Sequence, residues 1–208
     1  INAQYGNLDL EIIISDNNSN DGTKEILSKV NNEKVKILYR TDNKGKGANI
    51  KNALKEADGD LILFQDADLE YSPADYLSLL EPFFKFNADV VYGSRLTRAK
   101  ATAIVGFPNY IGNHILTFIA NFLFNKIFTD IATGYKVFKK EIIKNIEITS
   151  DGFEIEPEIT AKISKNKKIR IFEVPITINS RSYSDGKKVR WWHFFTYLYH
   201  FIKWKFIN

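Results

Sequence analysis

Three carboxylates follow a short apolar run in the first half of the chain. Asp66, Asp68 and Glu70 stand at alternate positions directly after residues 61–64, which are all apolar. In an extended segment, alternate residues lie on one side of the backbone, so we expect these side chains to approach one another. Oxygen ligands suit a hard divalent cation such as Mg²⁺ or Mn²⁺. The alternative is a strand that ends in a solvated acidic turn.

Two further polar groups also follow predicted strands. Asp16 follows the β-branched run at residues 10–15, and Arg95 comes shortly after the apolar segment at residues 89–92. Strands that alternate with helices predict right-handed βαβ units and a mostly parallel sheet, in which ligands bind beyond the C-terminal ends of the strands. We therefore expect Asp16, Arg95 and the acidic group at Asp66 to share one site.

The elements that position these groups can be placed from periodicity and turn signals. We expect helices at residues 23–30, 48–57, 73–87, 109–128 and 153–163, and strands at residues 10–15, 35–39, 61–64, 89–92, close to 136–138 and at 169–174. Pro175 predicts that the last strand lies at a sheet edge or ends there. The sequence shows no repeat and no domain boundary, so we expect a single domain over residues 1–208.

Composition narrows the class of protein. The chain has 208 residues, of which 44% are hydrophobic and 26% charged, as in folded soluble domains. The absence of cysteine excludes disulfides and thiolate metal sites. A net charge of +4 fits phosphate-bearing ligands or an anionic membrane surface and falls short of a nucleic-acid-binding signature.

Seven motifs, in this order and spacing, resemble the inverting glycosyltransferases of family 2. The resemblance is strongest to their dolichyl-phosphate and polyprenyl-phosphate sugar transferases, including dolichol-phosphate mannosyltransferases. The motifs lie at residues 14–23, 43–47, 66–70, 93–95, 133–138, 156–158 and 181–188.

The resemblance implies an α/β domain of the GT-A fold, with a mostly parallel central sheet flanked by helices. Residues 1–95 would form the nucleotide-sugar-binding half and residues 96–208 the acceptor-binding half. The family opens with a strand and a Pro-x-Tyr-Asn-Glu segment that this sequence lacks, so we expect an N-terminally truncated domain with its first strand missing. The second acid of the usual Asp-Asp-Gly-Ser turn is Asn17 here.

The family resemblance also implies roles in donor binding. Asp16 would accept hydrogen bonds from the nucleotide base, with an Asx-turn that caps the following helix as the alternative. Lys46 would flank the nucleotide, although a solvated basic loop explains it equally well. Asp66, Asp68 and Glu70 would hold Mg²⁺ or Mn²⁺, which neutralises the leaving diphosphate. Asp68 is the first choice of ligand and Glu70 the last.

Acceptor roles fall in the second half. The resemblance assigns Arg95, Arg181 and Lys187 to the acceptor phosphate, a task that suits a guanidinium fork, and Arg95 joins Asp66 and Asp68 as a catalytic residue. Alternatives are a surface ion pair for Arg95 and a solvated charge run at residues 181–188.

A second set of acids leaves two interpretations open. One of them could serve as a general base if the acceptor is a hydroxyl, whereas an ionised phosphate needs no base. Otherwise these acids cap helices and orient basic side chains such as Lys136 or Arg181. The set comprises Asp130, Glu154, Glu156 and Glu158.

The chain ends in an aromatic and basic segment at residues 191–206 that fits a helix at a bilayer interface, with core packing as the alternative.

Together, the family resemblance and these sequence features predict a metal-dependent enzyme on the cytoplasmic face of the membrane. It would transfer a hexose from a donor of the UDP-glucose or GDP-mannose type to a polyprenyl or dolichyl phosphate. Three rival hypotheses are transfer to a saccharide hydroxyl in cell-envelope polysaccharide synthesis, a catalytically silent nucleotide-binding domain, and a nucleotidyltransferase.

Overall fold

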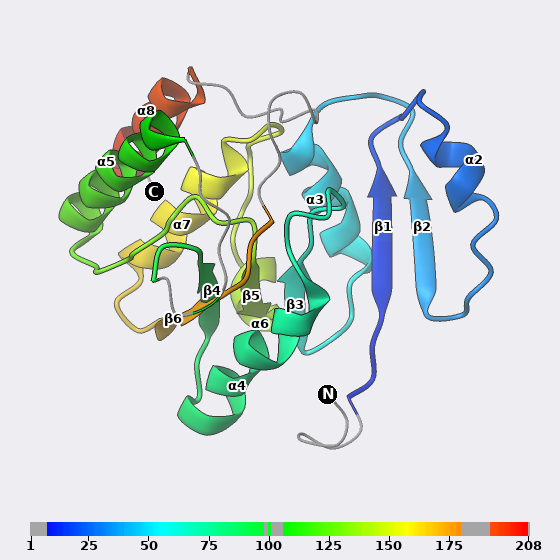
Figure 1. Ribbon diagram of the computed structural model, residues 1–208, viewed down its shortest axis with the longest axis horizontal. Helices are drawn as coiled ribbons and strands as arrows, with labels where there is room; N and C mark the ends of the chain where they lie inside the picture. Colours follow the sequence, from blue (N-terminus) through cyan, green and yellow to red (C-terminus); the bar gives the residue numbers. More distant parts are fainter. Residues whose placement is uncertain (1–7, 98–99, 101–105, 180–191, 208) are drawn as a thin grey trace.

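The computed structural model describes residues 8–97, 100, 106–179 and 192–207. Strands and helices alternate along most of this part of the chain (Figure 1). In chain order they are β1 (Ile12–Asp16), α2 (Thr23–Leu27), β2 (Val35–Tyr39), α3 (Lys46–Glu56), β3 (Leu61–Phe64), the 3-10 turn η1 (Pro73–Asp75), α4 (Tyr76–Phe86), β4 (Val90–Ser94), α5 (Phe107–Phe124), β5 (Lys136–Lys139), α6 (Lys140–Lys144), α7 (Ile155–Lys165), β6 (Ile171–Pro175) and α8 (His193–Phe206).

The predicted elements are present, and α6 is an additional short helix that no sequence pattern predicted. The helix predicted over residues 109–128 ends earlier, at Phe124. Asn125 adopts a left-handed conformation with φ of 51°, and the Asn121 side chain bonds both the N–H and the carbonyl of Phe128. These contacts turn the chain out of the helix.

The larger sheet is mixed rather than mostly parallel. Its strand order is β3-β5-β4-β6, and β5 runs antiparallel to both β3 and β4, whereas β4 and β6 are parallel. Because β5 inserts between β3 and β4, these two successive strands never bond to each other. The strand β6 lies at the edge and ends at Pro175, as the sequence predicts.

A second, two-stranded sheet lies apart from the first. The strands β1 and β2 are parallel, with Ile12 opposite Val35 and Asp16 opposite Tyr39. Figure 1 shows α3 between β1 and the edge strand β3, and no strand among the described residues joins these two edges.

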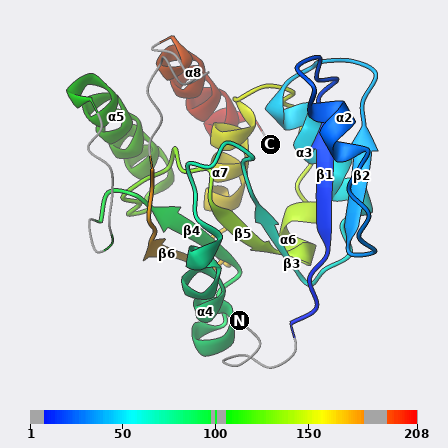
Figure 2. The same ribbon diagram turned by 45° about the vertical axis from the view of Figure 1, so that its right-hand side comes forward.

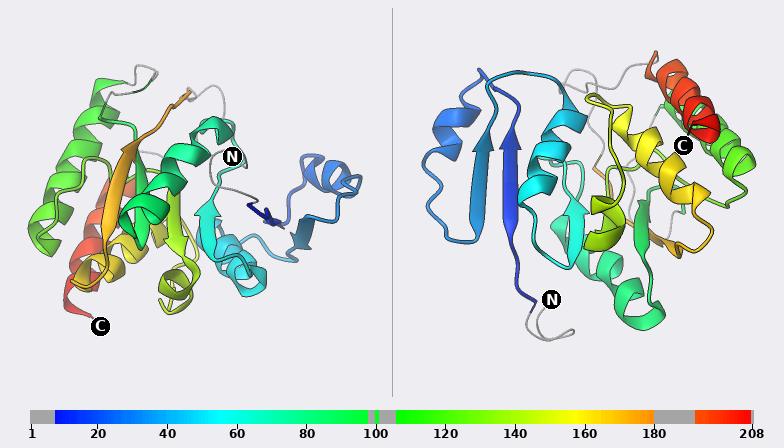
Figure 3. Two further views of the ribbon diagram at one scale, coloured as in Figure 1. Left: turned by 90° about the horizontal axis from the view of Figure 1, so that it is seen from below. Right: turned by 180° about the vertical axis from the view of Figure 1, so that it is seen from behind.

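The core has two parts, one on each face of the larger sheet (Figures 2 and 3). Helices α5, α7 and α8 cover the face that carries Val90, Tyr92 and Phe138. Helix α4 covers the face that carries Val91 and Val137. The two sets alternate along β4 and β5 because successive side chains of a strand point to opposite faces.

This alternation decides where Lys136 points. It stands two positions before Phe138 and therefore faces the layer of α7, where its side chain is completely buried. A buried ammonium group needs an opposite charge close by. Glu156, at the start of the covering helix α7, supplies this negative charge.

Candidate active site

The acidic segment is a turn and not an extended strand. Residues 67–70 leave β3 in a turn in which Leu69 has φ of 61°, and the Glu70 N–H donates to Oδ1 of Asp68 over 3.2 Å. This local hydrogen bond and the left-handed residue end the strand. The extended geometry predicted for Asp66, Asp68 and Glu70 is therefore wrong, although all three follow the C-terminal end of β3.

The first residue of α3, Lys46, brings a cation to Asp66. Nζ of Lys46 lies 2.8 Å from Oδ1 and 2.9 Å from Oδ2 of Asp66, and 2.9 Å from Oε1 of Glu156. The other oxygen of Glu156 bonds Nζ of Lys136, which also donates to the carbonyl of Thr133. Four charged side chains from α3, the acidic turn, β5 and α7 thus form one cluster.

The charges in this cluster stabilise one another. Burial alone would raise the pKa of Glu156, but the ammonium groups of Lys136 and Lys46 lower it to about 2. Burial lowers the pKa of Lys136 despite the neighbouring carboxylate. For Lys46, the carboxylates of Glu156 and Asp66 outweigh burial and raise its pKa.

Two glycines make this arrangement possible. Gly45 has φ of 113°, and both Gly45 and Gly47 lie against the backbone of residues 150–152. The N–H groups of Gly47 and Ala48 donate to the carbonyls of Gly152 and Asp151 over 3.2 and 2.9 Å. The first N–H groups of α3 therefore bond protein carbonyls, and the fixed backbone directs Lys46 toward the cluster.

Gly47→Ala is expected to lower the free energy of unfolding by about 1–3 kcal/mol. An added Cβ would lie 2.5 Å from the carbonyl oxygen of Ser150 and 2.9 Å from the carbonyl carbon of Asp151, so the two backbones must separate. Urea unfolding followed by circular dichroism measures this change.

Gly112→Ala is the matched control for this substitution. Its Cβ would meet only Phe194, at 4.0 Å, and helix propensity should stabilise the protein by up to ~1 kcal/mol. If both variants unfold at the same urea concentration, the close approach of Gly47 does not matter for stability.

Acid should destabilise the protein through two buried glutamates. Glu158 accepts hydrogen bonds from the N–H groups of Thr149 and Ser150 and from Lys162. Although burial would raise its pKa, these donors lower it to about 2, as for Glu156. A carboxyl group with a depressed pKa stabilises the folded state above its unfolded pKa, and this contribution is lost as the pH falls toward the folded pKa.

The free energy of unfolding should therefore fall between pH 4.5 and 2 by about 1.4 kcal/mol per pH unit for each proton taken up on unfolding. Urea titrations at several pH values test this slope. The Glu156→Gln and Glu158→Gln variants should each show a shallower slope, and an unchanged slope in both would contradict the assignment.

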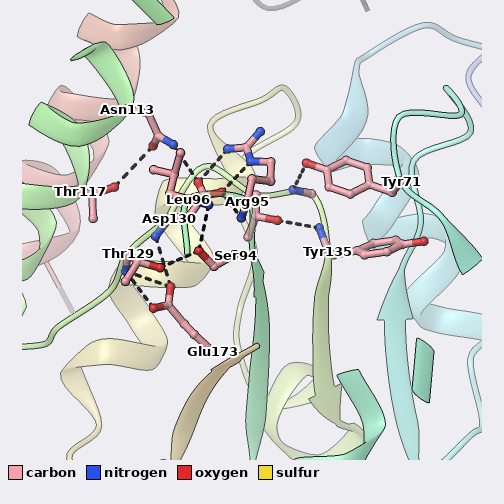
Figure 4. A network of polar contacts seen from close by, with 12 residues as sticks. Tyr71, Ser94, Arg95, Leu96, Asn113, Thr117, Thr129, Asp130, Tyr135 and Glu173 are labelled. Atoms are coloured by element: carbon pink, nitrogen blue, oxygen red, sulfur yellow. Dashed lines mark hydrogen bonds and ion pairs between the residues drawn. The ribbon is translucent and has the colours of Figure 1, made fainter. Parts of the chain in front are cut away.

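Arg95 forms a second buried network (Figure 4). Its Nε and Nη2 donate to the two oxygens of Asp130 over 2.6 and 2.7 Å, and its backbone N–H donates to Oδ2. Burial would raise the pKa of Asp130, but Arg95 and Asn113 hold it below its usual range. The ion pair predicted as an alternative for Arg95 is thus present, with Asp130 completely buried and the Arg95 side chain 21% exposed.

Surrounding groups fix this pair in place. Asn113 on α5 donates to Oδ1 of Asp130 over 2.8 Å. Glu173 on β6 accepts hydrogen bonds from the backbone N–H groups of Thr129 and Asp130. The guanidinium plane is held rigidly, and its Nη1 has no hydrogen bond to any residue in the described part of the chain.

The two networks are neighbours through Gly134. Its N–H donates to the Tyr71 hydroxyl over 2.8 Å, and a Cβ added there would lie 2.7 Å from Oδ2 of Asp66 and 2.9 Å from the Tyr71 ring. Burial raises the pKa of Tyr71, and the nearby charge of Arg95 partly opposes this. The acidic turn and the Arg95 pair therefore form adjacent parts of one polar region.

Some residues predicted for the site lie apart from these networks. Asp16 is buried at the end of β1, and its Oδ2 accepts a hydrogen bond from the Ser19 N–H over 3.1 Å. This bond lies in the turn after β1 and does not cap the following helix, which the alternative role predicted, because α2 begins at Thr23 without a side-chain cap. Within the described ranges, neither network includes Asp16. Arg181 and Lys187 lie outside the described residues.

The Glu156–Lys136 contact agrees with the alternative predicted for the second set of acids, which is to orient basic side chains such as Lys136. One contribution was not recognised in the sequence. Tyr197 on α8 is buried, and burial and the charge of Glu156 raise the pKa of its hydroxyl. The charges of Lys46 and Arg95 oppose this shift, and no sequence pattern indicated that Tyr197 would be buried.

The acidic turn can be tested as a metal site. Nowhere in the described ranges do three His, Cys, Asp or Glu side chains group closely enough to hold a metal ion by themselves. Mg²⁺, however, commonly takes one or two protein carboxylates and completes its coordination with substrate phosphates and water. The carboxylates of Asp66 and Asp68 have the ligand chemistry that such a shared cation requires.

Comparison with known proteins gives a consistent result. Residues 1–147 match the family model described as Glycosyl transferase family 2. A dolichol-phosphate mannosyltransferase of Pyrococcus furiosus is 29% identical over 209 residues, covering 98% of this chain and 58% of that protein. A UDP-N-acetylglucosamine–dolichyl-phosphate N-acetylglucosaminyltransferase of Methanococcus voltae is 28% identical over 205 residues, covering 89% and 81%. The chain thus spans somewhat more than half of the Pyrococcus protein.

Solved structures share the fold. Mannosyl-3-phosphoglycerate synthase of Rubrobacter xylanophilus has a TM-score of 0.68 at 18% identity, covering 98% of this chain and 64% of that one. Glucosyl-3-phosphoglycerate synthase of Mycobacterium tuberculosis, in complex with Mn²⁺, uridine diphosphate and phosphoglyceric acid, has a TM-score of 0.67 at 14% identity, covering 95% and 68%. These similarities confirm the predicted GT-A fold.

Proposed function

The chain belongs to glycosyltransferase family 2, and on this basis we propose that it transfers a hexose from a nucleotide sugar to a polyprenyl or dolichyl phosphate. The relatives from Pyrococcus and Methanococcus, whose names specify dolichol phosphate or dolichyl phosphate, support this acceptor. The donor is of the UDP-glucose or GDP-mannose type.

In this proposal the donor lies between the end of β1 and the acidic turn. Asp16 accepts hydrogen bonds from the base, and Lys46 faces the diphosphate. Asp66 and Asp68 hold Mg²⁺ or Mn²⁺, with Glu70 as a further candidate. The cation, when bound, neutralises charge on the leaving diphosphate. The presence of Mn²⁺ and uridine diphosphate in a solved structure of the same fold supports this assignment.

Arg95 binds the acceptor phosphate through the part of its guanidinium that Asp130 does not engage, and Arg181 and Lys187 complete this phosphate site. A phosphate oxygen attacks the anomeric carbon while the bond from that carbon to the diphosphate breaks. The nucleoside diphosphate leaves with the bonding electrons, and the in-line attack inverts the anomeric configuration.

One observation supports a phosphate over a hydroxyl acceptor. Three of the four acids considered as a general base are already engaged in charged or buried contacts, whereas Glu154 accepts a hydrogen bond from the Gly152 N–H. Asp130 pairs with Arg95, Glu156 with two lysines, and Glu158 with backbone N–H groups. Each has a pKa below its usual range, which makes it a poor acceptor of a proton. A phosphate that is already ionised requires no such base.

A transfer assay with the full-length protein tests the proposal. UDP-glucose, UDP-N-acetylglucosamine and GDP-mannose are each offered with dolichyl phosphate or with a saccharide alcohol, in Mn²⁺ or in EDTA. We expect metal-dependent transfer to dolichyl phosphate and about 10²-fold slower transfer by Asp68→Asn. Transfer only to the saccharide hydroxyl, or equal rates in EDTA, would contradict the proposal.

The outer faces of α5 and α8 support contact with the membrane that holds such an acceptor. The helices lie side by side (Figure 1), with the rings of Phe124 and Phe201 6.2 Å apart. Large apolar side chains remain exposed on both helices, including Phe118 (71%) and Phe122 (79%). The other members of this exposed set are Phe107, Ile111, Ile115, Phe195, Tyr199, Ile202 and Phe206, and Trp192 directly precedes α8.

Of the helices in the described ranges, none is long and apolar enough to cross a bilayer. We propose that this aromatic face rests at the interface of the cytoplasmic leaflet. Sedimentation with vesicles of phosphatidylcholine and phosphatidylglycerol should show at least about threefold weaker binding for Phe118→Ser/Phe122→Ser. Phe84→Ser, which removes an exposed phenylalanine from α4, is the matched control, and equal losses would contradict the assignment.

A further inference from the structure

Lys46 occupies a cation position inside the proposed donor site. Its side chain is only 17% exposed and bonds both oxygens of Asp66, whereas Lys44 in the loop before α3 is 57% exposed and pairs with Asp42. The two lysines therefore have different roles. Lys44 matches the solvated loop, and Lys46 neutralises a carboxylate that is a candidate ligand for a divalent cation.

This placement makes each expected ligand unfavourable on its own. A divalent cation at Asp66 would meet the positive charge of Lys46, which already holds both carboxylate oxygens. A diphosphate that approached Lys46 would meet the negative charge of Asp66. Like charges at such short range oppose binding. When both ligands are present, the cation pairs with Asp66 and the diphosphate pairs with Lys46.

We propose that Lys46 is an exchangeable counter-ion, which releases Asp66 and pairs with the donor diphosphate when the donor binds. This exchange makes binding of the divalent cation and binding of the nucleotide mutually dependent. This inference rests on the proposed function, because it takes its two ligands from there. It assigns a positioning role to Lys46 and gives a physical reason why binding of the divalent cation would change the affinity for the nucleotide, and the reverse.

The surroundings of Lys46 allow this exchange. Its backbone is fixed because Gly45 and Gly47 dock against residues 150–152, so only the four-carbon side chain needs to move. Glu156 would keep its bond to Lys136 after Lys46 leaves. The cluster therefore retains a paired, buried glutamate in both positions of Lys46.

Calorimetric titration of the chain with Mn²⁺ alone, with UDP or GDP alone, and with both tests the inference. In the wild type, we expect Mn²⁺ and the nucleotide to strengthen each other's binding by about tenfold or more. Lys46→Gln should bind Mn²⁺ alone about tenfold more tightly, bind nucleotide more weakly, and reduce the coupling to below about threefold. Lys44→Gln, the matched control, should behave as the wild type.

Asp66→Asn tests the exchange from the other side and does not depend on the folding of the lysine variant. Without Asp66 as a competitor, Lys46 should bind UDP or GDP more tightly in the absence of metal. If Lys46→Gln binds Mn²⁺ no more tightly than Lys44→Gln, or if Asp66→Asn does not improve metal-free nucleotide binding, the exchange is wrong while the proposed function stands. If no variant binds Mn²⁺ or nucleotide under any condition, the proposed function itself fails.

Discussion

Asp130→Asn should lower the free energy of unfolding by about 3–5 kcal/mol, because it leaves the guanidinium of Arg95, whose side chain is only partly exposed, without a counter-charge. The Asp130 side chain is completely buried and accepts three hydrogen bonds from Arg95 and one from Asn113. Asparagine has nearly the same shape, but its NH₂ group faces donors instead of accepting from them. Urea unfolding measures the loss.

Two comparisons show whether this loss comes from the buried charge. Glu81→Gln removes the partner of Lys85 in an exposed i,i+4 pair on α4 and should cost no more than ~0.5 kcal/mol. The double variant Arg95→Met/Asp130→Leu removes both charges and should recover part of the stability. If Asp130→Asn unfolds like Glu81→Gln, the buried pair contributes little to the fold.

Glu156→Gln should have an effect of similar size, about 3–5 kcal/mol, because it removes the carboxylate that lies between two lysines. Lys136 is completely buried, and its other hydrogen bond is to the carbonyl of Thr133. The amide of glutamine cannot compensate two ammonium groups. Urea unfolding and thermal melting both report this change.

Glu154→Gln is the control, because Glu154 lies two residues before Glu156, directly before α7. Glu154 accepts a hydrogen bond from the Gly152 N–H, which an amide oxygen can replace, so we expect little change in stability. Adding Lys136→Met to Glu156→Gln should restore much of the loss. If the double variant is no more stable than Glu156→Gln alone, an unpaired Lys136 is not the cause.

These expectations change how the choice of acceptor should be tested. Replacing Glu156 and Glu158 by glutamine would not by itself identify a catalytic base. Both carboxylates hold backbone or lysine groups in the buried part of the domain. A loss of activity in such variants would reflect unfolding, so the acceptor is better identified by offering different acceptors to the unmodified protein.

Much of the architecture follows from the sequence because it depends on local patterns. Apolar runs located the strands, and turn residues located the loops that carry Asp66 and Arg95. The partner of Arg95 was harder to predict, since Asp130 reaches it only because β5 returns antiparallel between β3 and β4. Sequence motifs gave the order of the segments and not their order in the sheet.

The alternate spacing of the acids did not predict the backbone shape of the acidic segment. Asp66, Asp68 and Glu70 have the spacing of one strand face, but Leu69 turns the chain with a positive φ that leucine seldom adopts. No glycine or asparagine marks that position. Similarly, the burial of Lys46 depends on the close approach of two glycines to residues 150–152, which lie about a hundred residues further along the chain.

The interruption between β1 and β3 has a consequence for how the proposed donor would be held. In β1 and β2 only Asp16 is buried, α2 has no buried residue, and the described chain contains no hydrogen-bonded ladder from this pair to the larger sheet. Although Ile13 packs against the main core, we expect a segment with so little buried surface to open as a unit before the larger sheet does. Asp16 therefore belongs to one unit, and Asp66 and Arg95 belong to another. A nucleotide sugar that contacted all three would bridge two units and would itself cross-link them.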